Sequence, residues 1–199
     1  MNKILPILII ISGPSAAGKS TLRSMLLQNH PELTYSISYT TRKPRPNEKD
    51  GVDYFFVSVE EFEKRISEND FLEYAIVYGN YYGTSKSQVE KVIENGKPIV
   101  LEVDVQGAEN IIKKYPDCCS IFIAPPSLDV LIKRFCLRGT ESQQEREKRI
   151  NEARNELSKK EIFKYTIIND NLEESYKKLE EVINNYQKEY YKQYRIINQ

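Results

Sequence analysis

The sequence predicts an α/β fold in which helices flank a central parallel β-sheet. Short apolar segments rich in β-branched residues, at 4–11, 99–105 and 121–124, have the composition of strands buried on both faces. Stretches with helical periodicity separate them, and strands that alternate with helices form parallel sheets that bind ligands at the carboxyl ends of the strands. Because the first segment runs directly into a glycine-rich turn, we expect a binding site at that end of the sheet.

Length and composition favour one domain of a protein from a reducing compartment. A chain of 199 residues is long enough for one well-buried core. The 29 basic and 29 acidic residues cancel, so no global charge favours nucleic acid or an anionic membrane. The first apolar run contains Pro6 and is too short to span a membrane. Three cysteines without metal-binding spacing and a single histidine, His30, disfavour a zinc site, and we expect a cytoplasmic protein.

The turn after the first apolar segment matches the phosphate-binding pattern G-x-x-x-x-G-K-[ST]. Glycines let backbone amides turn toward phosphate oxygens, and the helix expected at about 19–27 adds its positive N-terminal end. An ordinary glycine-rich turn would not need Lys and Ser at the helix start. We therefore expect a nucleoside triphosphate, with Lys19 reaching its β- and γ-phosphates and the Ser20 hydroxyl binding Mg²⁺. The loop consists of Gly13, Pro14, Ser15, Ala16, Ala17, Gly18, Lys19, Ser20 and Thr21.

Residues 36–56 are polar, contain prolines and are rich in aromatic and β-forming residues, which predicts a small strand-rich insert over the ligand site. Within it, Arg42 and Arg45 lie on either side of a proline, and the planar guanidinium group forms two parallel hydrogen bonds with a phosphate. Ser38 and Tyr54 add neutral donors. Beside a triphosphate loop, this cluster indicates a phosphoryl acceptor; alone, it is more typical of a basic surface loop, or of a phosphopeptide-binding segment.

The remaining elements follow from caps and periodicity. Ser58 is a suitable N-cap for a helix at 59–68, and a helix at 84–95 is stopped by Gly96 and Pro98. Residues 127–160 are strongly charged and predict a solvated helical arm, which by itself is typical of an exposed face. A short strand at 167–168 precedes a final amphipathic helix, in which apolar residues recur every three or four positions.

Several short blocks occur in one order from about Ile7 to the last helix, and together with the phosphate loop and residues 38–54 they resemble guanylate kinase, a nucleoside-monophosphate kinase of the P-loop family. Each block alone is weak evidence, whereas the ordered set covers nearly the whole chain. The further blocks are Phe71-Leu72-Glu73-Tyr74, Gly79-Asn80-Tyr81-Tyr82-Gly83, Val103-Asp104-Val105-Gln106-Gly107, Ala124-Pro125-Pro126-Ser127, Arg138-Gly139-Thr140 and Asn169-Asp170.

The resemblance implies a reaction and a division of the chain. The reaction is transfer of the γ-phosphoryl group of MgATP to GMP, and also to dGMP, giving ADP and GDP in purine nucleotide metabolism. Within one domain, 1–199, it implies a core (1–35, 96–126 and 161–199), a GMP-binding region (36–95) and a lid (127–160). The expected partners are ATP and GMP with Mg²⁺, without nucleic acid or membrane, and the expected state is a monomer or a weak homodimer.

The resemblance also implies roles on the GMP side. Glu73 would recognise the base, because a carboxylate accepts from both N1–H and the N2 amino group of guanine, whereas adenine lacks this arrangement of donors. Thr84 would contact the guanine carbonyl. Asp104, at a strand end, would lie near GMP and the metal, which it would bind directly or through water. The GMP phosphate would be held by Ser38, Arg42, Arg45, Tyr54 and Tyr82.

On the ATP side, the resemblance places Arg134 and Arg138 at the triphosphate, together with the residues of the phosphate loop, and Asn169 at the adenine. Four residues apart, the two arginines would share a helix face. Fixed cations stabilise the charge that spreads over the equatorial oxygens during phosphoryl transfer. No general base is needed, because the attacking phosphate of GMP is already mostly dianionic near pH 7. The expected catalytic residues are Lys19, Arg42, Arg138 and Arg149.

Four positions depart from the family pattern. Ala16 replaces a glycine, and a left-handed backbone there would cost about 1–2 kcal/mol. Asn47 also replaces a glycine, but asparagine tolerates this region better than most residues. Glu102 stands in place of an aspartate, and Thr84 replaces a serine while keeping the hydroxyl. We expect these changes to affect rate and nucleotide fit more than reaction class.

An alternative interpretation is a guanylate-kinase-like scaffold module, which binds phosphorylated peptides through the same insert and has lost catalysis. Such modules typically lack an intact phosphate loop. Here Gly13, Gly18, Lys19 and Ser20 are all present, which favours the enzyme.

Overall fold

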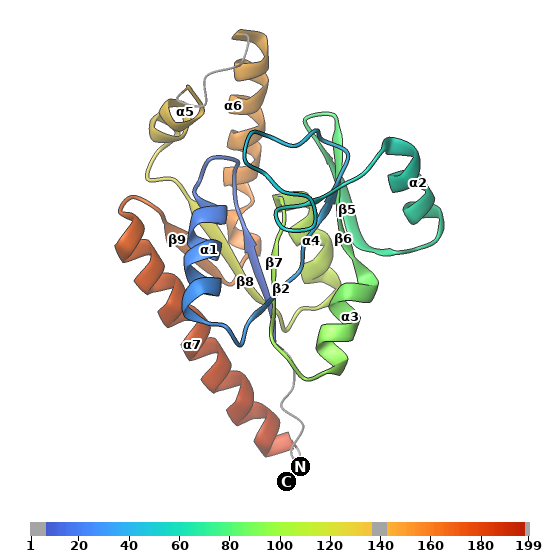
Figure 1. Cartoon of the computed structure of the whole chain (residues 1–199). Helices are drawn as coiled ribbons and strands as arrows, with labels where there is room; N and C mark the ends of the chain where they lie inside the picture. Colours follow the sequence, from blue (N-terminus) through green and yellow to red (C-terminus); the bar gives the residue numbers. More distant parts are fainter. Residues whose placement is uncertain (1–6, 137–142, 198–199) are drawn as a thin grey trace.

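The computed structural model of the protein describes residues 7–136 and 143–197 (Figure 1). Its main sheet has five strands in the order β2-β7-β1-β8-β9, and every neighbouring pair is parallel. This arrangement confirms the predicted fold class. The strands are β1 (Leu8–Ser12), β2 (Thr34–Tyr35), β7 (Ile99–Glu102), β8 (Cys119–Ala124) and β9 (Tyr165–Ile168).

Helices cover both faces of this sheet because successive side chains of a strand point to opposite faces. Ile9 and Ile11 of β1 pack in one buried cluster with α1 and α7, whereas Leu8 and Ile10 pack in a second cluster with α3 and α4. The apolar run of the first segment therefore serves two cores at once. The helices are α1 (Lys19–Asn29), α3 (Lys86–Glu94), α4 (Val105–Lys114) and α7 (Leu172–Ile197).

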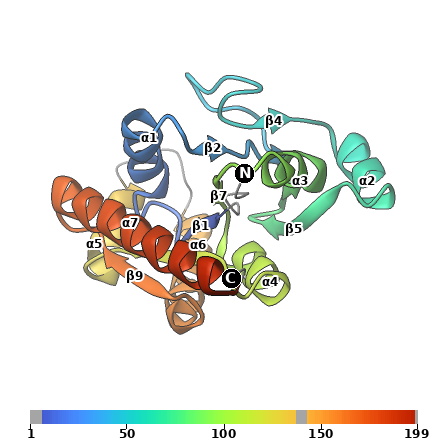
Figure 2. The same cartoon turned by 90° about the horizontal axis from the view of Figure 1, so that it is seen from below.

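A second sheet of four strands, in the order β4-β3-β6-β5, lies on the side of the molecule away from α5 (Leu128–Cys136) and α7 (Figures 1 and 2). Its long antiparallel hairpin turns at Tyr78 and Gly79, both of which have positive φ. Ser58 caps α2 by accepting a hydrogen bond from the Glu61 amide, as the sequence predicts. The elements are β3 (Tyr39–Thr40), β4 (Phe55–Phe56), α2 (Val59–Ser67), β5 (Phe71–Val77) and β6 (Asn80–Ser85).

Capping residues explain two of the differences between predicted and observed boundaries. The helix expected at 84–95 begins at Lys86, because Thr84 and Ser85 complete β6 and the Ser85 hydroxyl caps the helix. The strand expected at 99–105 ends at Glu102, because Asp104 turns the chain and caps α4 through the amides of Gln106 and Gly107.

The charged arm is helical, as predicted, and comprises α5 (Leu128–Cys136), α6 (Gln143–Ser158) and the short 3₁₀ helix η1 (Lys160–Ile162). It is not wholly solvated, because Leu131 and Ala153 are fully buried between its helices and Leu157 packs on the sheet. Among the residues that the structure describes, no helix is both long and apolar enough to cross a membrane.

Candidate functional site

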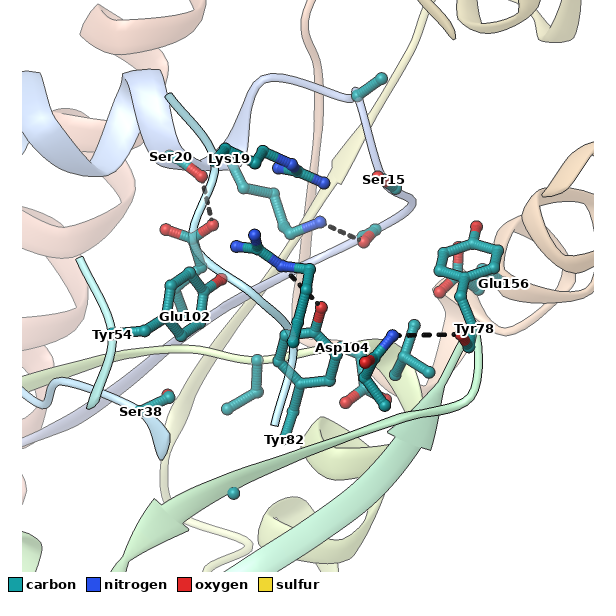
Figure 3. A pocket seen from close by; sticks show the side chains of 18 of the residues that line it. Ser15, Lys19, Ser20, Ser38, Tyr54, Tyr78, Tyr82, Glu102, Asp104 and Glu156 are labelled. Carbon is teal, nitrogen blue, oxygen red and sulfur yellow. Dashed lines mark hydrogen bonds between the residues drawn. The ribbon is translucent and has the colours of Figure 1, made fainter. Parts of the chain in front are cut away.

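A pocket of about 530 Å³ opens at the carboxyl ends of β1 and β7, between the phosphate loop, the four-stranded sheet and α6 (Figure 3). Residues predicted from separate parts of the sequence meet here. Those that line the pocket are Gly13, Ser15, Ala16, Gly18, Lys19, Ser20, Thr21, Ser38, Arg42, Arg45, Tyr54, Glu73, Tyr82 and Asp104.

The phosphate loop curls through three left-handed residues, Gly13, Ala16 and Gly18, with φ values of 136°, 63° and 96°. Ala16 thus carries the strain that its sequence position predicts, about 1–2 kcal/mol. Gly18 is the N-cap of α1, so the loop leads straight into the helix N-terminus. The Lys19 ammonium lies back over the loop and donates to the carbonyls of Gly13 (2.6 Å) and Pro14 (3.0 Å).

Glu102 joins the start of α1 to the end of β7. The Ser20 hydroxyl donates to Glu102 Oε1 at 2.6 Å (Figure 3), and Arg23 Nε lies 3.3 Å from Glu102 Oε2. Position 102, where the family pattern has aspartate, therefore carries a glutamate side chain that reaches the Ser20 hydroxyl, which is predicted to bind the metal.

These oxygens, with the nearby Asp104 carboxylate, are the donors that Mg²⁺ prefers. No group of three or more acidic, histidine or cysteine side chains able to hold a metal occurs in the described part of the chain. The residues therefore fit an ion that completes its shell with phosphate oxygens and water.

Arg42 is held by oxygens of its own segment and of β6. Its Nε donates to the Tyr82 hydroxyl (3.2 Å), one terminal nitrogen to the Lys43 carbonyl (2.7 Å) and the other to Glu48 Oε1 (2.9 Å). The second oxygen of Glu48 accepts from the Arg45 amide at 2.7 Å. This network fixes the guanidinium plane at the pocket before any anion is bound. The turn that carries Glu48 includes Asn47, whose φ of 72° shows why a glycine or asparagine suits that position.

Glu73 is a buried carboxylate that lines the pocket. Its side chain comes from β5, and the residue is 6% exposed. Oε1 accepts from the Thr84 hydroxyl at 2.7 Å, whereas Oε2 is buried and has no hydrogen-bond partner. Burial, and then the charge of Asp104, raise the pKa of Glu73 to about 7. The site therefore offers one unsatisfied acceptor to a ligand.

Asp104 lines the pocket and also caps the N-terminus of α4. Its Oδ1 accepts from the amides of Gln106 (2.8 Å) and Gly107 (3.1 Å) at the start of α4. Burial raises the pKa of this carboxyl above its ordinary value, although these amides oppose the shift.

Five predicted residues do not line the pocket. Thr84 holds Glu73, and its contact with guanine stays a prediction. Pro14 and Ala17 contribute carbonyls to the loop: the Pro14 oxygen accepts from Lys19, and the Ala17 oxygen accepts from the side-chain amide (Nδ2) of Asn169 at 2.8 Å. Arg134 donates to the Asn169 carbonyl at 2.9 Å, so these two residues are linked.

Two predicted arginines cannot be placed. Arg138 lies outside the described residues, and Arg149 belongs to α6 but its side chain lies outside the described part of the structure. Their catalytic roles stay predictions.

The sequence missed several residues of the pocket. Glu156 of α6 gave no signal, because one glutamate among many in a charged helix looks solvated. Its Oε2 is buried without a hydrogen-bond partner, and burial raises its pKa to about 7. Asn80 and Gly83 belong to a block used for the resemblance, and Glu102 was noted as a departure. The missed lining residues are Val77, Tyr78, Asn80, Gly83, Glu102, Val103 and Glu156.

Comparison with known proteins confirms the resemblance drawn from the sequence. The family model described as guanylate kinase matches residues 6–186. The guanylate kinase of Clostridium perfringens strain 13 is 47% identical over 187 residues, which cover 92% of this chain and 87% of that protein. The guanylate kinase of Oceanobacillus iheyensis is 45% identical over 199 residues, or 100% of this chain and 95% of the relative.

A solved structure agrees with these relatives. The crystal structure of guanylate kinase from Anaplasma phagocytophilum aligns with a TM-score of 0.77 at 31% identity, covering 93% of this chain and 88% of that chain.

Proposed function

The chain belongs to the guanylate kinase family, and we propose that it transfers the γ-phosphoryl group of MgATP to GMP, giving ADP and GDP. One observation carries the proposal. A single pocket has Lys19 and Ser20 at a phosphate loop, Arg42 at a second cationic cluster, and Glu73 with an unpartnered buried oxygen at a third point. This layout suits a triphosphate donor and a purine monophosphate acceptor at the same time.

Glu73 provides the base recognition in this proposal. Its ionised carboxylate accepts from N1–H and the N2 amino group of guanine, which supplies a partner for the Oε2 that lacks one. With AMP, the carboxylate would stay buried without donors, and sites of this kind discriminate by roughly 10⁴ or more. Without ligand, the Thr84 hydroxyl donates its one proton to Glu73 Oε1. The contact with the guanine carbonyl that the family resemblance implies would take this proton in place of Glu73.

Arg42 and Arg45 hold the GMP phosphate, with hydroxyl donors from Ser38, Tyr54 and Tyr82. The contacts of Arg42 to Glu48 and Tyr82 orient the guanidinium group before GMP binds. The Arg42 side chain therefore loses less conformational entropy when the phosphate binds. The phosphate attacks without a general base because it is mostly dianionic near neutral pH.

The ATP phosphates lie along the loop from Gly13 to Thr21, and Lys19 exchanges the carbonyls of Gly13 and Pro14 for phosphate oxygens. Ser20, with Glu102 and Asp104 directly or through water, would hold Mg²⁺. When bound, this ion neutralises charge on the β- and γ-phosphates.

The arm forms the lid, residues 127–160, over the core and the GMP-binding region at 36–95. From it, Arg134, Arg138 and Arg149 stabilise the transferring group, and Asn169 lies at the adenine. Closing the lid over bound GMP excludes water, which keeps ATP from being hydrolysed. We propose a cytoplasmic monomer or weak homodimer, for which size-exclusion chromatography is the test of state.

The test is ADP formation from MgATP with GMP, dGMP, AMP, CMP or UMP. We expect turnover with GMP and dGMP that falls at least about a hundredfold in Lys19→Ala. Arg138→Ala should lower turnover far more than it weakens GMP binding. Absence of turnover with every acceptor, in protein that still binds GMP, would refute the proposed activity and support the scaffold module.

A further inference from the structure

The first turn of α4 lies directly against the Glu73 carboxylate. A Cβ atom added at Gly107 would lie closer than 3.0 Å to Glu73 Oε2, a separation that Cβ atoms do not adopt. It would also lie 2.9 Å from Glu73 Cδ. The carboxylate therefore occupies the space that any side chain at position 107 would need.

The other contacts of Glu73 leave the carboxylate little room to move. Oε1 is tied to Thr84 of β6 at 2.7 Å, and the strand that carries Glu73 is irregular between Phe71 and Glu73. The carbonyl of the intervening Leu72 accepts a hydrogen bond from the Lys114 ammonium, at the far end of α4, at 2.6 Å. Contacts from β6 and from both ends of α4 thus fix where Oε2 lies.

We propose that Gly107 is a positioning residue for guanine specificity: by lacking a side chain, it seats the Glu73 carboxylate so that Oε2 faces the donors of the base. The inference rests on the proposed function, because it assumes that Glu73 reads the guanine. Gly107 itself touches neither the base nor the phosphate in this assignment.

The backbone at Gly107 does not need glycine. It lies inside α4 and is absent from the residues with positive φ, so alanine fits its conformation. Alanine is a better helix former than glycine, which favours the folded state. The nearest atoms that alanine would displace belong to the end of the Glu73 side chain and not to the backbone. Gly107→Ala should therefore fold normally while pushing the carboxylate out of its seat.

The experiment measures GMP binding by calorimetry, kcat and KM for GMP, AMP and ATP, and unfolding in urea. Asn110→Ala is the matched control, because it also places alanine in α4. For Gly107→Ala we expect GMP affinity to fall about tenfold or more, since a buried hydrogen-bonded contact is lost. At pH 8, where Glu73 is mostly ionised and has no proton to donate to adenine, KM for AMP and KM for ATP should change little. Unfolding should occur at equal or higher urea, and Asn110→Ala should behave as wild type.

A double-mutant cycle distinguishes seating from general damage. Glu73→Asp shortens the side chain and should weaken GMP binding in the wild-type background. In the Gly107→Ala background, Glu73→Asp should reduce GMP affinity much less, because the shorter carboxylate no longer collides with the alanine. A coupling of this kind is expected only for side chains in contact. If Glu73→Asp reduces GMP affinity by the same factor in both backgrounds, the proposal is overturned.

Other results would also overturn it: unchanged GMP affinity in Gly107→Ala, an equal loss in Asn110→Ala, an AMP constant that worsens as much as that for GMP, or a Gly107→Ala protein that does not fold. The wild-type protein tests the proposed function separately. If it binds GMP without turnover, the kinase assignment fails, and the binding data still decide the role of Gly107.

Discussion

Glu73→Gln is expected to stabilise the protein at alkaline pH while it weakens GMP binding. Glu73 is 6% exposed, and its Oε2 is buried without a hydrogen-bond partner. Burial first, and then the charge of Asp104, raise its pKa from an ordinary 4.5 to about 7. The folded protein therefore holds this proton more tightly than the unfolded chain does.

The sign and size of the effect follow from proton linkage. A carboxyl whose pKa is raised by folding contributes stability that is fully present below its unfolded pKa and is lost as pH rises through its folded pKa. At about 1.4 kcal/mol per pKa unit, the rise from 4.5 to about 7 corresponds to about 3 kcal/mol. Wild type loses this stability between about pH 4.5 and pH 8. Glutamine does not titrate, so the variant does not lose this stability as pH rises.

Urea unfolding of both proteins at several pH values between 5 and 8 measures this difference. The free energy of unfolding of Glu73→Gln, relative to wild type, should increase across this range by most of 3 kcal/mol. Titrating groups that are not coupled to Glu73, including Glu156, contribute equally to both proteins and cancel. A difference that stays constant with pH would refute the reasoning, because it would mean that the Glu73 carboxyl titrates alike in the folded and unfolded states.

The remaining predictions concern the loop, the acceptor arginine and the one histidine. Gly13→Ala should lower the free energy of unfolding by about 2 kcal/mol or more, because φ is 136° and the new Cβ would collide with the Ile123 backbone; urea unfolding tests this. Arg42→Lys should raise KM for GMP about tenfold and leave KM for ATP unchanged, because lysine cannot reproduce the planar contacts to Tyr82 and Glu48. Partial burial alone would lower the pKa of His30, but hydrogen bonds to Glu180 and Glu32 raise it. His30→Gln should therefore lower the melting temperature at pH 5.5 and much less at pH 8.5, since the stability from this pair is lost as pH rises through the folded pKa.

The phosphate loop and the main sheet could be predicted because their physics is local. A loop that must turn its amides toward phosphate needs glycines at fixed spacing, and Gly13 and Gly18 have the positive φ values that this requires. Ile9, Ile10 and Ile11 are fully buried, so their strand shows as a continuous apolar run.

The hairpin of β5 and β6 was not predicted as strands, because its pattern is inverted. Glu73 points inward, whereas Tyr74 and Ile76 on β5 are 44% and 58% exposed. Alternation of polar and apolar residues normally places the apolar side chains in the core. Here a binding carboxylate occupies the inner face, so function overrides the pattern on which strand prediction depends.

The partners within the site depend on tertiary structure and could not be predicted. The sequence identifies Arg42 as a phosphate-binding residue, but not Glu48 as the carboxylate that holds it. Glu156 is one of many charges in its helix, and only the packing of α6 against the pocket distinguishes it.

Without ligand, the phosphate-binding residues of the pocket have hydrogen-bond partners within the protein, whereas the residue expected to recognise the base does not. Lys19 and Arg42 are satisfied by oxygens of the protein, so phosphates replace existing partners. Glu73 Oε2 has no hydrogen-bond partner, and a proton is one way to relieve its charge. A protonated carboxyl both donates and accepts, and this arrangement matches the N1 and N6 edge of adenine.

Discrimination between GMP and AMP should therefore decline as pH falls below about 7, the pKa of Glu73. The ionised fraction falls about tenfold for each pH unit well below the pKa, so the ratio of kcat/KM for GMP to that for AMP should fall at a similar rate. The two substrates carry the same phosphate, whose own titration cancels in the ratio. In Glu73→Gln the ratio should not depend on pH. A wild-type ratio that is constant from pH 8 to pH 5.5 would show that the ionisation of Glu73 does not set the choice of base.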